Sequence, residues 1–360
     1  MIKKLRLALS EFNWKKRNFI RKYTSRFTAF LERKRLGFVV HWPGWLKAIF
    51  YLAPALLLLA VFTFYPIINS FLISFLEGYN IQTGEFDDYT LIGNYRYIIL
   101  EATGFRQAVI NTALIVAITV PATVLISLFI AVALASIKPL KGFYQTVFFL
   151  PYITNTIAIG LVFAFMFSGN ANTINTTLGL VNQILVWFGA RPIIWLGTGN
   201  IAEGIRGATY WSAMSVILIY TIWNGLAFKI IVFLSGIQGI DKQYYQAAQI
   251  DGASKSKALR RITVPLISPM IFYILITSVI GGFKTYTSVV AIINTEGIIT
   301  TGASGLINLK TIVFYVYDFI GMAGINGMMS YASAAAIILF IIILMFTMVQ
   351  LYVGKRRVHY

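Results

Sequence analysis

Of the 360 residues, 58% are hydrophobic and only 12% are charged, and the mean hydropathy is +0.76. These values exclude an ordinary soluble domain and are typical of a protein embedded in a bilayer. In a soluble protein a net charge of +18 favours nucleic-acid binding. In a membrane protein the distribution of charge along the chain is more informative than its total. The chain has no cysteine, which excludes disulfides and thiolate chemistry.

The chain begins with a strongly basic arm, residues 1–47, which holds 13 Lys and Arg residues. Aromatic and apolar residues recur there at helical spacing among the cations, which indicates either an amphipathic helix on anionic headgroups or a flexible basic tail. The arm and the apolar stretch that follows it are both too long for a cleaved signal peptide. We therefore expect a retained cytoplasmic arm.

Six apolar stretches are long enough to cross a bilayer as helices, which takes about 20 residues each. They cover residues 48–76, 108–137, 143–167, 207–228, 262–293 and 328–353. The alternation of a β-barrel strand is absent. The sequence therefore predicts an all-α polytopic membrane protein with a six-helix domain at 48–353 and a short tail at 354–360.

Lys and Arg residues are concentrated on one side of this predicted topology. The arm, the turn at Lys138 and Lys141, the segment 229–261 and the tail together hold 24 of the 30 basic residues, whereas the other six are accompanied by eight acidic ones. The positive-inside rule then places both termini and the segment 229–261 in the cytoplasm. The loop between the third and fourth spans is external, and its residues 178–188 predict a short interfacial helix, with Trp187 and Trp195 near headgroup level.

The cytoplasmic loop at 241–265, here called the coupling loop, has the pattern of two short helices joined by a sharp turn. Residues 243–250 are good helix formers, Gly252 can adopt a left-handed conformation, and Ser254 can cap a second helix that leads toward Pro265. Its small side chains would let another protein approach closely: Ala247, Ala248 and Ala253. Gly252 alone is also compatible with an ordinary helix end.

At these residues the chain resembles the permease family of binding-protein-dependent ABC transporters for maltose, multiple sugars and glycerol phosphate. The family's cytoplasmic signature is E-A-A-x-x-D-G-A followed by I-x-L-P. The corresponding residues here are Gln246-Ala247-Ala248, Asp251-Gly252-Ala253 and Ile262-Thr263-Val264-Pro265. Gln246 and Val264 depart from the usual glutamate and leucine. The resemblance extends over roughly residues 50–355.

The resemblance implies several partner proteins, each with its own role in transport. A second homologous permease would complete the pore, an extracytoplasmic binding protein would deliver the solute, and closure of two cytoplasmic ATPases would drive transport. The coupling loop would dock on an ATPase through Gln246, Ala247, Ala248, Asp251, Gly252, Ala253 and Pro265. The chain contains no G-x-x-x-x-G-K-[ST] phosphate-binding loop, so ATP and Mg would be bound by the partners. The cations at 255–261 are either part of this dock or the basic flank of the fifth span.

Candidate substrate contacts lie near the interiors of the predicted spans. Lys284 follows Gly281 and Gly282, and it would either donate to a solute or extend to the external headgroups. The other candidates for stacking on a sugar or hydrogen bonding to it are Tyr286, Asn224, Trp223 and Asn155.

We therefore expect a non-enzymatic permease subunit that imports a sugar or oligosaccharide, with an anionic solute such as glycerol phosphate or an acidic oligosaccharide as the alternative. A membrane-embedded enzyme would need acids, bases or nucleophiles that the spans lack, and a passive channel would transport without an ATPase. No cofactor is expected in this chain, and no metal site, because its two histidines, His41 and His359, lie outside the spans.

Overall fold

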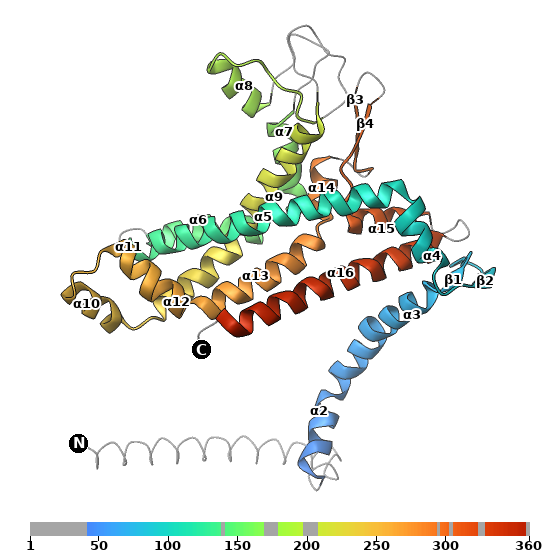
Figure 1. Ribbon diagram of the computed structural model, residues 1–360, viewed down its shortest axis with the longest axis horizontal. Coiled ribbons are helices and arrows are strands. Elements are labelled where there is room, and N and C mark those ends of the chain that lie inside the picture. The colour runs from blue at the N-terminus through green and yellow to red at the C-terminus, as the bar shows by residue number, and fades with distance from the viewer. Residues whose placement is uncertain are drawn as a thin grey trace, which may run out of the picture. The chain divides into compact units, whose positions relative to one another are not determined.

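The computed structural model (Figure 1) describes residues 42–137, 141–168, 179–196, 208–293, 296–301, 305–322 and 328–357. The predictions for residues 1–41 of the basic arm, for Lys138 and for both histidines fall outside these residues. The chain divides into two units, Met1–Ser70 and Phe71–Tyr360, and each is described by itself.

The described part of the first unit is an apolar helix without buried side chains. It consists of α2 (Gly44–Leu59), a π-helical turn η2 (Ala60–Phe64) and the start of α3 (Tyr65–Ile73). Together the three form a 30-residue stretch that is long and apolar enough to cross a membrane. It matches the predicted span at 48–76 but begins four residues earlier. Its exposed Leu, Ile and Phe side chains suit a hydrocarbon environment.

Long helices form the core of the second unit. They are α5 (Thr103–Ser136), α9 (Tyr210–Gln238), α13 (Ser268–Phe283) and α16 (Met328–Arg357). Helix α5 packs against both α9 and α13, and α16 packs against α13. Three clusters of buried apolar residues lie between these helices. Among the residues that the structure describes, four helices qualify as spans outright, or six if each of two bent pairs counts as one span. This count agrees with the six-span prediction.

The predicted third span is one of the bent pairs. Helix α6 (Lys141–Ile153) and helix α7 (Thr156–Met166) meet at an angle of 97°. The break falls at Asn155, whose side-chain oxygen accepts hydrogen bonds from the N–H groups of Ile157 and Ala158, at 2.9 and 3.3 Å. An asparagine in this extended conformation starts a new helix. The span predicted at 143–167 therefore consists of two helices with a sharp bend between them.

The predicted fifth span is also interrupted. Helix α11 (Lys255–Ala258), the π-helical turn η4 (Leu259–Thr263) and α12 (Val264–Leu266) lead into α13 with a bend of 68°. Pro265 lies inside this approach, so it does not mark the beginning of the span. At the other end, α13 stops at Phe283, and a separate short helix, α14, covers Thr287–Ile292. The expected single helix at 262–293 is thus three segments.

Several shorter elements accompany the long helices. They are β1 (Leu76–Glu77) paired with β2 (Asp88–Tyr89), α4 (Gly93–Arg96), η3 (Tyr97–Glu101), α8 (Leu180–Trp187), β3 (Ile298–Thr301) paired with β4 (Gly305–Asn308), and α15 (Ile312–Gly321). Both strand pairs are antiparallel, with Leu76 opposite Tyr89 and Ile298 opposite Asn308. Helix α8 confirms the short helix expected at 178–188.

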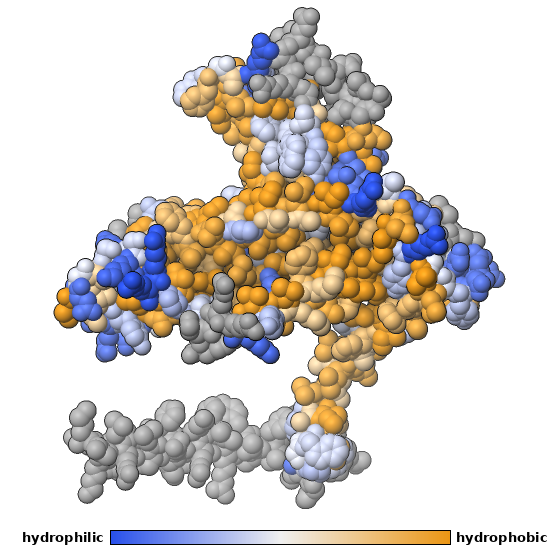
Figure 2. Space-filling view, viewed as in Figure 1, coloured by the Kyte–Doolittle hydropathy of each residue, from blue (hydrophilic) through white to orange (hydrophobic). Residues whose placement is uncertain are grey.

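Both ends of the second unit are more polar than the middle of its long helices (Figure 2). Figure 1 places α10 (Lys242–Ile250) and α11 at the end of the long helices where α16 ends. Figure 2 shows apolar residues over the long helices and hydrophilic residues gathered around α10 and α11. An apolar band between polar ends is the surface expected of a bundle that crosses a bilayer.

A buried asparagine joins the strand pair β3–β4 to the helix core. Asn111 in α5 is fully buried, and its amide nitrogen donates to the carbonyl oxygens of Asn308 and Lys310 at 3.0 and 2.9 Å. Its oxygen accepts from the hydroxyl of Tyr210 at 2.8 Å and from the amide of Gln107 at 3.0 Å. These bonds join α5 to β4, to the residues that follow β4 and to α9.

The Asn111→Ala variant should therefore unfold at a lower temperature than the wild-type protein. Loss of the amide leaves buried polar groups unpaired, which costs about 1–3 kcal/mol. Heat-induced unfolding of the purified complex in detergent measures the effect, with Gln82→Ala, at an exposed position, as the control. Equal unfolding temperatures for the two variants would contradict this role of Asn111.

Candidate functional site

The coupling loop has the predicted arrangement of helix, turn and helix. Asp241 caps α10 by accepting a hydrogen bond from Gln243 N at 2.9 Å, and Ser254 caps α11 by accepting from Lys257 N at 3.3 Å. Between the helices, Gly252 has φ +67°. This is the left-handed region, which residues with a Cβ rarely occupy.

Two backbone hydrogen bonds define the turn. Ala253 N donates to Ala248 O at 2.8 Å, and Gly252 N donates to Gln249 O at 3.1 Å, which is the Schellman motif. The hydroxyls of Tyr245 and Thr263 share a hydrogen bond of 2.9 Å that ties α10 to η4. The loop is therefore held to the start of the fifth span as one compact element.

The residues predicted to contact an ATPase do not all face outward. Gln246, Ala247, Asp251 and Gly252 are exposed. Ala248 is buried and Ala253 half-buried, because both line a cavity of about 460 Å³ beneath the loop. The expectation that Ala248 belongs to the outward surface was therefore wrong: adjacent residues of a helix point about 100° apart, and Ala247 occupies the outer side.

Sequence reasoning missed an apolar side chain at the tip of the loop. Ile250, the last residue of α10, is 87% exposed. It lies one helical turn after Gln246 and Ala247, so the three share a face of α10. A large exposed aliphatic residue outside the apolar band indicates a protein contact more than a lipid contact.

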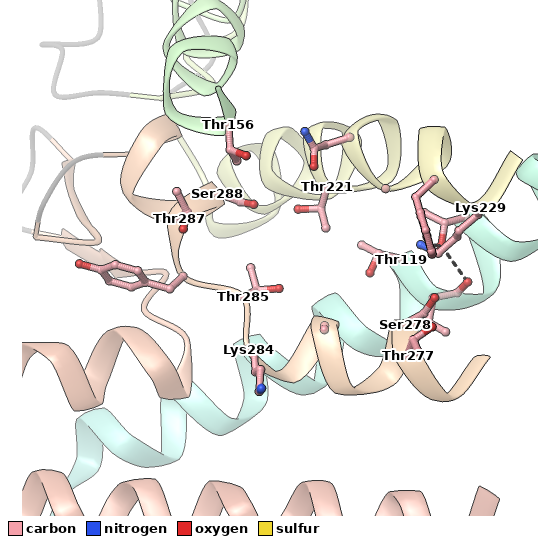
Figure 3. Close-up of a pocket in the computed structure, with 18 residues that line it drawn as sticks. Thr119, Thr156, Thr221, Lys229, Thr277, Ser278, Lys284, Thr285, Thr287 and Ser288 are labelled. Atoms are coloured by element: carbon pink, nitrogen blue, oxygen red, sulfur yellow. Dashed lines mark hydrogen bonds between the residues drawn. The ribbon is translucent and has the colours of Figure 1, made fainter. Parts of the chain in front are cut away.

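A second candidate site is a polar cavity among the long helices. It has a volume of about 410 Å³ and is lined by residues of α5, α7, α9, α13 and α14 and by the connection 284–286 (Figure 3). Nine Ser and Thr residues line it: Thr119, Thr123, Thr156, Thr221, Thr277, Ser278, Thr285, Thr287 and Ser288. Its lining contains no Asp, Glu, His or Cys, so it lacks the side chains that most often hold a metal.

Three of the five predicted substrate residues line this cavity, namely Asn224, Tyr286 and Lys284. Lys284 is exposed at the end of α13, and Figure 3 shows its side chain pointing away from the hydroxyl groups. The other two have different surroundings. Trp223 packs on Phe163, with ring centroids 5.3 Å apart, and the side chain of Asn155 caps α7.

Lys229 was not predicted as a site residue, because it was taken to close the fourth span. Helix α9 continues past it to Gln238, so Lys229 lies inside the helix and lines the cavity. Its Nζ donates to Thr123 Oγ1 on α5 at 2.8 Å. The signal that could have revealed it is the apolar run that resumes directly after the lysine, at residues 230–237.

Two hydroxyl groups of the cavity lack hydrogen-bond partners among the residues that the structure describes. They are the buried Oγ1 of Thr221 and the buried Oγ of Ser278, on opposite sides of the cavity wall in α9 and α13. A buried hydroxyl without a partner costs free energy. Bound water or a bound solute with hydroxyl groups would satisfy both.

Comparison with known proteins finds one matching family and related transport proteins. A family described as "Binding-protein-dependent transport system inner membrane component" matches residues 103–359. The arabinooligosaccharides transport permease AraP of Bacillus subtilis is 31% identical and covers 83% of this chain and 85% of its own length. The lactose transport permease LacF of Rhizobium radiobacter is 28% identical over 87% of this chain and 94% of its own.

A solved structure has the same fold. A chain in the crystal structure of a bacterial alginate ABC transporter, in complex with a periplasmic protein bound to alginate pentasaccharide, superimposes with a TM-score of 0.64 at 19% identity. The superposition covers 92% of this chain and 98% of that one. At this identity the superposition shows that the two chains share a fold.

Proposed function

Because the chain belongs to the family of inner membrane components of binding-protein-dependent transport systems, we propose that it is one of two permease subunits of an ABC importer for a sugar or oligosaccharide. The observation that carries this proposal is the polar cavity among helices that are otherwise apolar. A solute path through a bilayer needs polar groups where the rest of the protein has none. The relatives named for arabinooligosaccharide and lactose transport support a sugar.

The chemistry of the cavity also suits a carbohydrate. Ser and Thr hydroxyls both donate and accept, which matches the hydroxyl groups of a sugar. Tyr286 and Phe228 add aromatic surface at the same cavity, and aromatic rings pack well against the apolar face of a sugar ring. A second permease would supply the rest of the path.

The coupling loop is the proposed attachment for the ATPases. Its exposed tip, formed by Gln246, Ala247, Ile250 and Asp251, would dock on a cytoplasmic ATPase that binds ATP and Mg. Closure of two ATPases would move the loop, and the bond between Tyr245 and Thr263 would pass this movement to the fifth span. The cavity would then face the two sides of the membrane in turn, with both termini in the cytoplasm.

The test is uptake by the reconstituted complex with its ATPases and its binding protein. Proteoliposomes loaded with ATP should accumulate labelled oligosaccharides, and liposomes loaded with ADP should not. Accumulation of no sugar from a broad panel would contradict the proposed substrate class. Equal uptake with ADP would contradict the ATP-driven mechanism and point to a passive channel.

A further inference from the structure

Lys229 is a cation placed well inside a membrane-spanning helix. Nine residues, 230–238, separate it from the end of α9, which is about 14 Å at 1.5 Å per residue. Ionisable side chains at such depth are costly and generally face a cavity or a partner. Lys229 does face the polar cavity.

The charge of Lys229 has no compensating carboxylate among the residues that the structure describes. Its hydrogen bond goes to the neutral hydroxyl of Thr123, and the cavity lining holds no acidic residue. Lys310, by contrast, pairs with Asp318. A cation removed from water is strongly destabilising unless an anion pairs with it.

The local structure holds the amine in the cavity. The Thr123 hydroxyl donates to Val120 O at 3.1 Å, so its oxygen is free to accept from Lys229 Nζ. Gly225 lies one turn earlier on α9, and a Cβ at that position would come within 3.2 Å of the amine. An ammonium group has three donors, and Thr123 uses one of them.

Groups that bind a solute surround the amine. Thr221, Gly225 and Lys229 follow one another at intervals of four residues and share a face of α9. Figure 3 shows Lys229 near Ser278 and Thr119 at one end of the cavity. The hydroxyls of Thr221 and Ser278 lack partners in the described part of the chain. One end of the cavity thus offers a cation and free hydroxyls together.

We infer that the transported solute carries an anionic group, a carboxylate or a phosphate, and that Lys229 binds this group in the cavity. The inference rests on the proposed import of a sugar and narrows its substrate class to acidic sugars or sugar phosphates. The ammonium would donate charge-assisted hydrogen bonds to the anion, which are about twice as strong as neutral ones. The hydroxyls of Thr221 and Ser278 would pair with the neutral part of the solute.

Uptake of matched probes by the full reconstituted complex tests this inference. The probes are digalacturonate against its neutral counterpart digalactose, and glucose 6-phosphate against glucose. Wild-type complexes should take up at least one acidic probe in preference to its neutral counterpart. Lys229→Met should lower that preference about tenfold or more, the loss expected for one hydrogen bond to a charged group. Lys229→Arg should retain most of it, which also shows that a folded complex forms.

The following results would overturn the inference. Equal or better uptake of both neutral probes by the wild-type complex would overturn the inference and leave sugar import intact. A preference that survives in Lys229→Met would overturn it too. Equal loss of acidic and neutral uptake in that variant would also overturn it, because Lys229 would then support the complex and not the anionic group. Uptake of neutral sugars from the broad panel without uptake of any acidic sugar or sugar phosphate would overturn the inference and leave sugar import intact. The digalacturonate and glucose 6-phosphate pairs distinguish a carboxylate from a phosphate.

Discussion

Replacing Gly252 with valine should abolish ATP-driven uptake while the protein still inserts into the membrane. The turn requires φ +67° at this position, and a β-branched residue in the left-handed region is a genuine outlier. The strain costs roughly 1–2 kcal/mol, which the short helices α10 and α11 can relieve by opening the Schellman turn. The loop would then lose the shape proposed to dock on the ATPase. Uptake and ATPase stimulation by the loaded binding protein should both fall more than about tenfold.

Gly189→Val is the matched control for this experiment. Gly189 follows α8 with φ +77°, and Ala190 N donates to Leu185 O at 2.8 Å in the same turn motif. A Cβ at either glycine meets no atom within 4 Å, so the two substitutions introduce the same backbone strain and no contact. The control should retain most of its uptake. Normal uptake by Gly252→Val would contradict the coupling role of the loop.

Replacing Gly281 with leucine should block uptake because the new side chain fills part of the cavity. Gly281 lines the cavity from α13, and a Cβ there meets no atom within 4 Å. The leucine side chain would therefore extend into open space and take up room that the solute needs. Leucine also has a higher helix propensity than glycine, by about 1 kcal/mol, so α13 should not be weakened. Uptake should fall about tenfold or more, whereas the complex should assemble and hydrolyse ATP at its basal rate.

Gly321→Leu provides the comparison for the cavity variant. Gly321 ends α15, away from the cavity lining, and it too has open space around a Cβ. That variant should transport normally. If Gly281→Leu transported as well as Gly321→Leu, the cavity would not be the solute path. Together, the Gly252 and Gly281 variants separate loss of coupling from loss of the path.

The local chemistry of the coupling loop could be predicted from the sequence because each signal acts over a few residues. A glycine able to adopt positive φ lies between two helix-forming segments, and Ser254 has the side chain of a helix cap. The apolar spans are equally evident, because about 20 apolar residues in a row have few other structural solutions. The prediction of a helix–turn–helix loop between the fourth and fifth spans is confirmed.

The bends and the cavity were not predictable in the same way, because a single polar residue marks the first and contacts between distant segments form the second. Asn155 is one polar residue in an apolar stretch, and only its hydrogen bonds to Ile157 and Ala158 identify it as the start of a new helix. Lys229 has the sequence signature of a cytoplasmic flank, yet Thr123, 106 residues earlier in the chain, accepts its hydrogen bond inside the bundle. Ala248 turns inward because the loop folds back on η4.

The central claim is that ATP turnover at the coupling loop changes the side of the membrane to which the cavity opens. The chain has no cysteine, so Ser278→Cys introduces a single thiol at the cavity wall. Labelling by a membrane-impermeant maleimide, added outside to complexes whose partners lack reactive cysteines, measures its exposure. We predict a clear rise in external labelling when ATP is trapped in hydrolysis-deficient ATPases together with the binding protein. Labelling at the same rate with and without ATP would contradict the account.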